Sequence, residues 1–447
     1  MRETPNKKRQ NVTMNTKKLI EEDLKHIWHP CTQMKDHETL PIIPIKSGRG
    51  VYLYDFEDNR YIDGVSSWWV NLFGHCNPYI NQKIKEQLET LEHVIFAGFT
   101  HEPIIKLSQR LCNLAPKGLE KCFYADNGSS AIEVALKMSF QYHKNKGQKR
   151  PLFVSLENSY HGETIGALAV GDVKLYKEVF DDILLQTIQT PVPKDQSEES
   201  AIKAADALEQ IFKEKADQIS AFIIEPLIQC SGGMNMYHPL YITLARKLCD
   251  DYNVHLIADE IAVGFGRTGK MFACEHAGVS PDFMTLSKGL TGGYLPLSVV
   301  LTTQDVYDAF YCDYAEFKAF LHSHSYTGNP LACSAANATL DIFENESILE
   351  KNQEKIALIA SKLERFKTLP NVQKIRQTGM IAAVELDVYP IDFRVNLKIF
   401  EFALKKGVIL RPLGNVVYFM PPYVITDEEI ETMMDVAYEA IVSLNRL

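Results

Sequence analysis

The sequence predicts an α/β protein whose large domain is built on a doubly wound, mostly parallel sheet. Between residues 77 and 330, short apolar runs alternate with stretches of helical periodicity, the pattern of strands joined by crossover helices. These runs are Cys122–Ala125, Leu152–Leu156, Ala221–Ile224, Val254–Ala258, Phe283–Leu286 and Ser298–Leu301. Polar residues follow several of them, and such sheets bind ligands outside the carboxyl ends of their strands. We therefore expect one site along that edge.

The composition narrows the class of protein. The chain has 447 residues, 46% of them hydrophobic, which is enough to bury a large core in two domains. The net charge of −10 argues against a nucleic-acid partner. The nine cysteines include no Cys-x-x-Cys pair and are typical of thiols in a reducing compartment. Because no apolar run approaches about 18 residues and no leader opens the chain, we expect a soluble cytoplasmic protein.

Changes in composition also predict the domain boundaries. Residues 1–18 are polar and basic and are expected to be a disordered tail, with Met14 as an alternative start. Residues 19–76 would form the N-terminal segment of a smaller domain. Residues 77–335 would form the large domain, and residues 336–447 the C-terminal part of the smaller one.

The first folded segment contains a predicted hairpin and two adjacent tryptophans. Alternating apolar residues within 51–62 predict the hairpin. Trp68 and Trp69 follow it, and because adjacent side chains face different ways, we expect one of them to line a pocket. His26 and His29 lie upstream, but no third ligand follows at a spacing typical of zinc, so we expect no metal site.

A glycine and two serines follow the first strand of the large domain. Gly128 allows a close turn, and Ser129 and Ser130 begin a predicted helix. The apolar face of this helix is expected to be Ile132, Ala135, Leu136 and Phe140. Free amides at a helix start can hold a phosphate. An ordinary N-cap explains the same residues, and the stretch alone does not separate the two interpretations.

Two further strand ends supply candidate wall residues. Tyr160 could stack on a flat cofactor ring, and His161 could hydrogen-bond or fill the loop. Glu225 and Gln229 follow the next strand, where a proline and two glycines turn the chain. Glu225 could equally be a structural carboxylate.

A lysine and an aspartate end two other strands. Lys288 follows a buried strand, and burial lowers the pKa of an ammonium group and makes the amine a nucleophile toward carbonyls. Asp259 could keep the ring nitrogen of pyridoxal phosphate protonated, the state in which that ring withdraws electrons. The alternative is that Asp259 caps a turn and Lys288 is solvated.

The segment Gly264–Gly269 matches the dinucleotide fingerprint Gly-x-Gly-x-x-Gly. That motif must open a helix, and Lys270–Pro281 is too short and too rich in turn residues for a crossover helix. We therefore expect no nicotinamide or flavin site here.

The C-terminal part is predicted to be helical at first, over residues 331–349 and 351–366. A strand pair at 381–386 and 408–410 and a last helix from Asp427 follow. Together with the N-terminal hairpin, these elements would form the smaller domain and bring Arg411 to the site.

Four motifs in order carry a resemblance to a known family. They are Asp259-Glu-Ile261, Gly264-Phe-Gly-Arg-Thr-Gly269, Ser287-Lys-Gly289 and Gly328-Asn-Pro330. From about Leu24 to the C-terminus, the chain resembles the class III, fold-type I pyridoxal-phosphate aminotransferases. The resemblance implies pyridoxal 5'-phosphate as cofactor and a homodimer with shared active sites.

The resemblance also implies roles for individual residues. Lys288 would bind the cofactor covalently and move the substrate proton, and Asp259 would pair with the ring nitrogen. Tyr160 and Ile261 would cover the two ring faces. Gly128, Ser129 and Ser130 would hold the phosphate, and Ser325 would reach the phosphate of the neighbouring subunit. Arg411 would bind a substrate carboxylate, while Trp68, Arg267 and Tyr418 would line the substrate pocket.

A second group of motifs narrows the resemblance to the biotin-pathway branch of the family. They include Trp28-His-Pro-Cys-Thr-Gln-Met34, the tryptophan pair and Arg411-Pro-Leu-Gly414. This branch implies amino transfer to 8-amino-7-oxononanoate, with S-adenosylmethionine or lysine as donor. The tryptophans favour S-adenosylmethionine, because an aromatic face suits a sulfonium cation. Cys31 departs from the branch, where a tyrosine closes over the donor.

Two other functions remain open from the sequence. One is another reaction of the same cofactor, an aminomutase or a transaminase for ornithine or 4-aminobutyrate. In those enzymes a glutamine is usual where this chain has Ala262. The other is a cofactor-binding regulator without turnover, against which the intact Lys288 argues.

Overall fold

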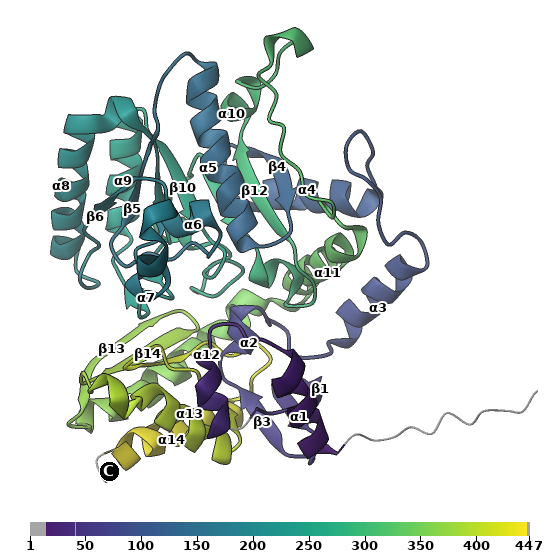
Figure 1. Ribbon diagram of the computed structural model, residues 1–447, viewed down its shortest axis with the longest axis vertical. Coiled ribbons are helices and arrows are strands. Elements are labelled where there is room, and N and C mark those ends of the chain that lie inside the picture. Colours follow the sequence, from purple (N-terminus) through teal and green to yellow (C-terminus); the bar gives the residue numbers. More distant parts are fainter. Residues whose placement is uncertain (1–14, 41, 445–447) are drawn as a thin grey trace, which may run out of the picture.

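The computed structural model describes residues 15–40 and 42–444 of the chain (Figure 1). Its main element is a seven-stranded sheet of order β4-β12-β11-β10-β7-β5-β6. The strands are β4 (Leu119–Ala125), β5 (Leu152–Leu156), β6 (Thr187–Thr190), β7 (Ile219–Ile224), β10 (His255–Asp259), β11 (Phe283–Leu286) and β12 (Ser298–Thr303). Only β12 runs antiparallel to its neighbours, so the predicted mostly parallel α/β sheet is confirmed.

The sequence missed the edge strand β6. Its residues Thr-Ile-Gln-Thr contain a single apolar side chain and are mostly half-buried, so they form no apolar run. The six predicted strands were found because their residues are buried on both faces, which produces continuous apolar runs.

Helices cover both faces of this sheet (Figure 1). On one face, α5 (Gly128–Asn145) packs on Ile223 and Ile257, and on the other, α8 (Glu198–Lys215) and α9 (Leu240–Asp251) pack on Phe222 and Leu256. Neighbouring strand residues thus face opposite layers, as the pleat requires. The predicted apolar face of α5 is buried except for Phe140, which is 40% exposed.

Two smaller sheets form a second lobe with the C-terminal helices (Figure 1). One has the order β1-β2-β3-β15 and the other β13-β14-β16. Their strands are β1 (Ile45–Arg49), β2 (Tyr52–Asp55), β3 (Arg60–Asp63), β13 (Val372–Thr378), β14 (Ile381–Leu386), β15 (Val408–Ile409) and β16 (Val416–Phe419). Strands β2 and β3 are the predicted hairpin, and β15 joins the C-terminal part of the chain to it.

The predicted pairing of 381–386 with 408–410 is wrong. Strand β14 lies between β13 and β16, whereas β15 runs parallel to β3 in the other sheet. The cause is that β13 contains exposed polar residues and hides its strand character, while β15 has only two residues. The position of Arg411 just after β15 therefore depends on the N-terminal hairpin.

The remaining elements are short or lie around the main core. The α-helices are α1 (Thr16–His26), α2 (Ser66–Trp69), α3 (Pro78–Leu88), α4 (Glu102–Leu114), α6 (Ile165–Val170), α7 (Lys174–Lys177), α10 (Gln304–Asp308), α11 (Pro330–Glu346), α12 (Ile348–Leu363), α13 (Val395–Lys405) and α14 (Asp427–Leu444). The 3-10 helices are η1 (Met34–Glu38), η2 (Glu178–Ile183), η3 (Ala216–Gln218), η4 (Ala273–His276), η5 (Lys288–Thr291), η6 (Tyr314–Glu316), η7 (Glu364–Thr368) and η8 (Ile391–Phe393). A short ribbon pairs β8 (Ile228–Gln229) with β9 (Asn235–Met236).

Regular structure begins earlier than the sequence predicted. Helix α1 starts at Thr16, and the side chain of Asn15 accepts a hydrogen bond from the Lys17 amide. Residues 15–18 therefore belong to a capped helix and not to a tail. Met14 and the rest of the predicted tail lie outside the described residues. No helix among those described is both long enough and apolar enough to cross a membrane.

A buried histidine in the sheet gives a pH-dependent prediction. His255 is 8% exposed, and burial together with His143 lowers its pKa to about 3. The native state keeps it neutral, whereas the unfolded chain binds a proton below about pH 6.5. Stability should therefore fall by about 1.4 kcal/mol per pH unit as the pH drops below 6.5. In urea titrations at pH 6.5 and 5, His255→Gln should lose about 2 kcal/mol less stability than the native sequence. An equal loss in both proteins would contradict this assignment.

Candidate active site

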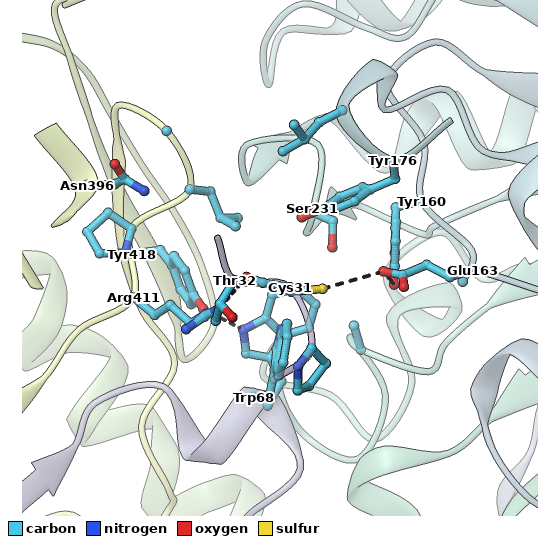
Figure 2. A pocket seen from close by; sticks show the side chains of 18 of the residues that line it. Cys31, Thr32, Trp68, Tyr160, Glu163, Tyr176, Ser231, Asn396, Arg411 and Tyr418 are labelled. Atoms are coloured by element: carbon cyan, nitrogen blue, oxygen red, sulfur yellow. Dashed lines mark hydrogen bonds between the residues drawn. The ribbon is translucent and has the colours of Figure 1, made fainter. Parts of the chain in front are cut away.

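A cavity of 1170 Å³ opens at the carboxyl ends of the large sheet, beside the second lobe. Segments from most of the chain line it, and Figure 2 shows part of this wall. They are residues 29–33, 36–37, 40, 42–43, 68–70, 127–129, 160–163, 175–176, 225, 231, 259, 261–263, 288, 394, 396–397, 400, 411–414 and 418. The strand ends singled out by the sequence therefore do meet at one place.

Lys288 follows β11 and lies in the wall of the cavity. Its backbone has a φ of 45°, a left-handed conformation that non-glycine residues rarely adopt and that is common at functional sites. Its Nζ lies 4.2 Å from the centroid of the Trp69 ring. Burial lowers the pKa of the Lys288 ammonium, although the charges of Asp259 and Glu225 oppose this. The site thus favours the neutral, nucleophilic amine.

Asp259 ends β10, and its carboxylate has a fixed orientation. Oδ2 accepts a hydrogen bond from Nδ1 of His161 at 2.7 Å, and Oδ1 accepts one from the Ile261 amide at 3.1 Å. Both side chains are buried. The Nε2 atom of His161 is buried without a hydrogen-bond partner among the described residues. A buried, oriented carboxylate of this kind can hold a cationic ring nitrogen.

Glu225 ends β7 and also lines the cavity. Its carboxyl group accepts hydrogen bonds from the amides of Tyr160 at 3.0 Å and Cys230 at 3.1 Å. Burial and the nearby charge of Asp259 raise the pKa of Glu225 well above its ordinary value. Glu225 thus fixes two loops of the wall, while Gln229, outside the cavity lining, donates to the carbonyl oxygen of Glu157.

Helix α5 points its N-terminus at the cavity. The cap is Asn127, whose side chain accepts a hydrogen bond from the Ser130 amide at 3.1 Å. The amides of Gly128 and Ser129 have no intrahelical partner at this helix start, and both residues line the cavity, unlike Ser130. A Cβ on Gly128 would come within 3.1 Å of the Ile261 side chain, so a larger residue here would have to displace that side chain. The N-cap and the anion site are therefore compatible.

Tyr160 and Ile261 contribute ring-sized surfaces to the wall. The Tyr160 hydroxyl donates to Oε1 of Glu163 at 3.0 Å. The Tyr160 and Tyr176 rings pack edge to face, with their centroids 5.5 Å apart. Burial and the charge of Glu163 raise the pKa of Tyr160. The phenol therefore stays neutral and keeps donating to Glu163.

The two tryptophans lie on a left-handed turn. Four consecutive non-glycine residues, Ser66 to Trp69, have φ values of 51°, 47°, 72° and 74°, which costs roughly 1–2 kcal/mol per residue. Asp63 stabilises the turn by accepting hydrogen bonds from the amide and hydroxyl of Ser67. The turn buries Trp69 beside Lys288 and leaves Trp68 42% exposed in the wall.

Arg267 lies behind this wall and not in it. The guanidinium is 1% exposed and donates to the carbonyl oxygens of Pro421, Trp69 and Asn71 at 2.8, 3.2 and 3.0 Å. The predicted role of Arg267 in the substrate pocket stays a prediction, although the residue lies outside the cavity lining. A fork of fixed donors suits three backbone carbonyls that must be satisfied in a buried position. The segment Gly264–Gly269 that carries it folds as turns, with only the short η4 behind it.

Loss of the Arg267 fork should destabilise the fold. Arg267→Lys keeps the charge but leaves buried carbonyls unpaired, so we expect a loss of roughly 3 kcal/mol in the free energy of unfolding. Arg394→Lys is the control, because the ion pair of Arg394 with Asp36 is exposed and should change by less than about 1 kcal/mol. Equal losses for the two variants in guanidinium titrations would contradict the role of Arg267.

Arg411, Tyr418 and Cys31 meet on the side of the second lobe (Figure 2). Arg411 lies 5.0 Å from the centroid of the Trp68 ring, and its Nη2 donates to the carbonyl oxygen of Cys31 at 3.2 Å. Tyr418 accepts a hydrogen bond from Nε1 of Trp69 at 3.1 Å. The Cys31 thiol is exposed and lies 3.9 Å from Oε1 of Glu163, and partial burial with this charge raises its pKa.

The cavity is therefore dipolar. Figure 2 shows Arg411 on one side and Glu163 on the other, with Cys31 between them. A carboxylate is attracted to the first end and a cation to the second. Sequence reasoning missed Glu163, although it lies in the same strand end as Tyr160.

A strap formed by residues 29–40 and 42–43 was also missed as part of the site, apart from Cys31. It lies over the cavity, and Asp36 accepts two hydrogen bonds from Arg394, at 3.1 and 2.6 Å. Arg394 begins α13, an amphipathic helix without any sequence signal for a site. Ser325 lies outside the cavity lining, exposed in the loop before α11. Its predicted role toward a neighbouring subunit stays a prediction.

The sequence and structure were compared with known proteins. The family model for class-III aminotransferases matches residues 32–441. The chain is 54% identical to the adenosylmethionine-8-amino-7-oxononanoate aminotransferase of Helicobacter pylori, over 92% of this chain and 94% of that protein. It is 44% identical to the protein of the same name from Geobacter sulfurreducens, over 94% and 96% of the two chains.

Two solved structures extend the comparison. A crystal structure of adenosylmethionine-8-amino-7-oxononanoate aminotransferase from Methanocaldococcus jannaschii has a TM-score of 0.93 and 39% identity, with 96% of this chain and 99% of that chain covered. An omega transaminase from Pseudomonas jessenii in complex with PMP has a TM-score of 0.90 and 29% identity, with 96% and 98% covered. The fold is therefore shared over nearly the whole chain.

Proposed function

The chain belongs to the class-III aminotransferases, and on that premise we propose that it transfers an amino group to 8-amino-7-oxononanoate and so makes 7,8-diaminononanoate for biotin synthesis. The amino donor in this proposal is S-adenosylmethionine. The observation that carries the proposal is that Lys288, Arg411 and Glu163 line the same cavity. Lys288 can react with the cofactor, Arg411 can bind a carboxylate, and Glu163 can attract a cation. The relatives named above for the adenosylmethionine reaction support this donor over lysine.

The residues present fit pyridoxal 5'-phosphate as the cofactor. The free amides of Gly128 and Ser129, with the hydroxyl of Ser129, would hold its phosphate. The predicted part of Ser130, which lies outside the cavity lining, stays a prediction. Asp259 would pair with its ring nitrogen, and the orientation that His161 gives the carboxylate suits that role. When bound, this cofactor withdraws electrons from the substrate carbon that carries the amino group.

Lys288 is the group of this chain that can move a proton. Its Nζ is held beside the Trp69 ring, and burial lowers the pKa of its ammonium group, which favours the neutral amine. A base positioned in this way can take the proton from the substrate carbon that carries the amino group. The left-handed turn that holds Trp69 fixes one side of this position.

Arg411 and the tryptophans suit the two substrates. Arg411 stacks on Trp68 and presents its fork to a carboxylate, which both substrates carry. The apolar faces of Trp68 and Tyr418 can contact the acceptor's aliphatic chain, and Trp68 with Glu163 suits the sulfonium cation of the donor. Donor and acceptor would occupy this cavity in turn, so one arginine serves both.

We also propose a homodimer with shared sites. Exposed aromatic residues cluster in the sequence around Ser325: Tyr311, Tyr314, Phe317 and Tyr326 are 79%, 88%, 79% and 64% exposed. Apolar patches of this kind often mark interfaces between subunits. Ser325 would then reach the phosphate of the neighbouring subunit. The domain boundaries at residues 76 and 335 and a cytoplasmic location likewise remain proposals.

The proposal is tested by product formation with purified enzyme. With 8-amino-7-oxononanoate as acceptor, S-adenosylmethionine should give 7,8-diaminononanoate, measured by mass spectrometry, whereas lysine at equal concentration should give far less. If only lysine gave product, lysine would replace S-adenosylmethionine as the proposed amino donor. Turnover only with simple omega-amino acids would instead favour an omega transaminase, the activity named for the Pseudomonas jessenii relative.

A further inference from the structure

Two cysteines outside the active site lie in contact with each other. Cys112 is on α4 and Cys122 on β4, and their sulfur atoms are 3.7 Å apart. Both are partly exposed and pack against the main hydrophobic core. The Cys122 thiol also lies 3.9 Å from the carbonyl oxygen of Ser108, and the hydroxyls of Ser108 and Tyr124 are 2.8 Å apart. Two contacts of Ser108 thus hold the helix and the strand together beside the sulfur contact.

The two thiols differ in acidity. A hydrogen bond from the Cys122 thiol to the sulfur of Cys112 lowers the pKa of Cys112 to about 7. The same contact, together with burial, raises the pKa of Cys122. The contact therefore favours the thiolate, the reactive form, at Cys112 and keeps Cys122 a thiol beside it. The other cysteines that the structure buries, such as Cys249 and Cys333, have pKa values raised by burial.

We propose that Cys112 and Cys122 form a reversible disulfide when a peroxide oxidises the enzyme. The Cys112 thiolate attacks hydrogen peroxide, so that an S–O bond forms, the O–O bond breaks and hydroxide leaves. The Cys122 sulfur then displaces the second hydroxide from Cys112 and gives up its proton to it. Two thiols are oxidised, and one peroxide is reduced to two waters.

Formation of this disulfide requires only a small movement of the two sulfur atoms. The sulfur atoms must close from 3.7 Å to about 2.05 Å, and only residues 115–118 separate the helix from the strand. The bond would join two elements that lie outside the cavity lining but connect to segments near it. The α4 cap residue His101 donates from Nε2 to the carbonyl oxygen of Gly328 at 2.7 Å, and β4 leads into the Asn127 cap of α5.

The direct test is peptide mapping of the oxidised holoenzyme. After mild hydrogen peroxide treatment, a cross-linked peptide pair containing Cys112 and Cys122, lighter by two hydrogen atoms, should appear and should vanish on reduction with dithiothreitol. The exposed Cys76 is the internal control and should remain a thiol under the same conditions. Oxidation of Cys112 to a sulfinic acid without cross-link, or reaction of Cys76 before Cys112, would overturn the proposal.

A second measurement tests the pairing without an oxidant. In the native enzyme, the rate of iodoacetamide alkylation of Cys112 should reach half its maximum near pH 7. In Cys122→Ala, which removes the thiol donor, this midpoint should move to about pH 8.5, the value of a free cysteine. Cys76→Ala should leave it unchanged. A midpoint that stays near pH 7 in Cys122→Ala would contradict the assigned pair.

Discussion

Replacing Lys288 with alanine should abolish turnover. The variant loses the only lysine amine in the cavity wall formed by the described residues, and with it both covalent attachment of the cofactor and proton transfer. The lost proton transfer alone is worth about 10²- to 10⁴-fold. Steady-state assays should therefore find a rate at least about 10²- to 10⁴-fold below that of the native enzyme. The visible absorbance of the lysine-bound cofactor should also disappear.

Lys270→Ala provides the matched control for this experiment. Lys270 is exposed, belongs to a neighbouring turn and donates to the carbonyl oxygen of Glu275, outside the cavity. Its removal should leave absorbance and rate nearly unchanged. An unchanged spectrum in Lys288→Ala would show that another group binds the cofactor, and the role assigned to Lys288 would have to be withdrawn.

Replacing Arg411 with alanine should weaken binding of the acceptor by about 2 kcal/mol, which is roughly a 30-fold rise in its dissociation constant. This loss in binding free energy is the lower end of the range for breaking a charge pair, as expected for an exposed guanidinium. Titration of the enzyme with 8-amino-7-oxononanoate measures the change.

Arg394→Ala separates a specific carboxylate contact from a general loss of positive charge. Arg394 lines the same cavity, but both of its terminal nitrogens already donate to Asp36. Its removal should change the acceptor's dissociation constant less than threefold, the scale of an exposed ion pair, ~0.6 kcal/mol. Equal losses in the two variants would mean that Arg411 acts only through net charge.

The sequence was most informative for features that depend on neighbouring residues in the chain, such as buried strands. Buried parallel strands appear as continuous apolar runs, and parallel strands bring their carboxyl ends to one edge. For that reason the strand pattern could place Asp259 and Lys288 at one edge of the sheet, and the resemblance to the family then gave both a role in one site. Edge strands carry a weaker signal, and β6 was missed because three of its four residues are polar.

Long-range packing was harder to predict. The partner of β15 is β3, far away in the sequence, and no local pattern encodes that pairing. The same holds for Arg267, whose acceptors on Trp69, Asn71 and Pro421 come together only in the folded chain. A resemblance can transfer the identity of such a residue, but its position behind the wall is decided by the packing of three distant segments.

The strap and the acidic end of the cavity show the same limit. Glu163 is one carboxylate among 57 acidic residues, and only its contacts with Tyr160 and Cys31 distinguish it. The left-handed turn at Ser66–Trp69 contains no glycine, the residue that would have indicated such a conformation in the sequence. Both features depend on neighbours from other parts of the chain, and a single sequence does not show which neighbours will meet.

The most direct test of the central claim is a half-reaction with the purified holoenzyme. S-adenosylmethionine, added without acceptor, should bleach the visible absorbance of the lysine-bound cofactor, and 8-amino-7-oxononanoate added afterwards should restore it with release of one diamine per site. Lysine at the same concentration should leave the absorbance unchanged. Bleaching by lysine alone would change the donor, and bleaching by neither compound would contradict the proposed function.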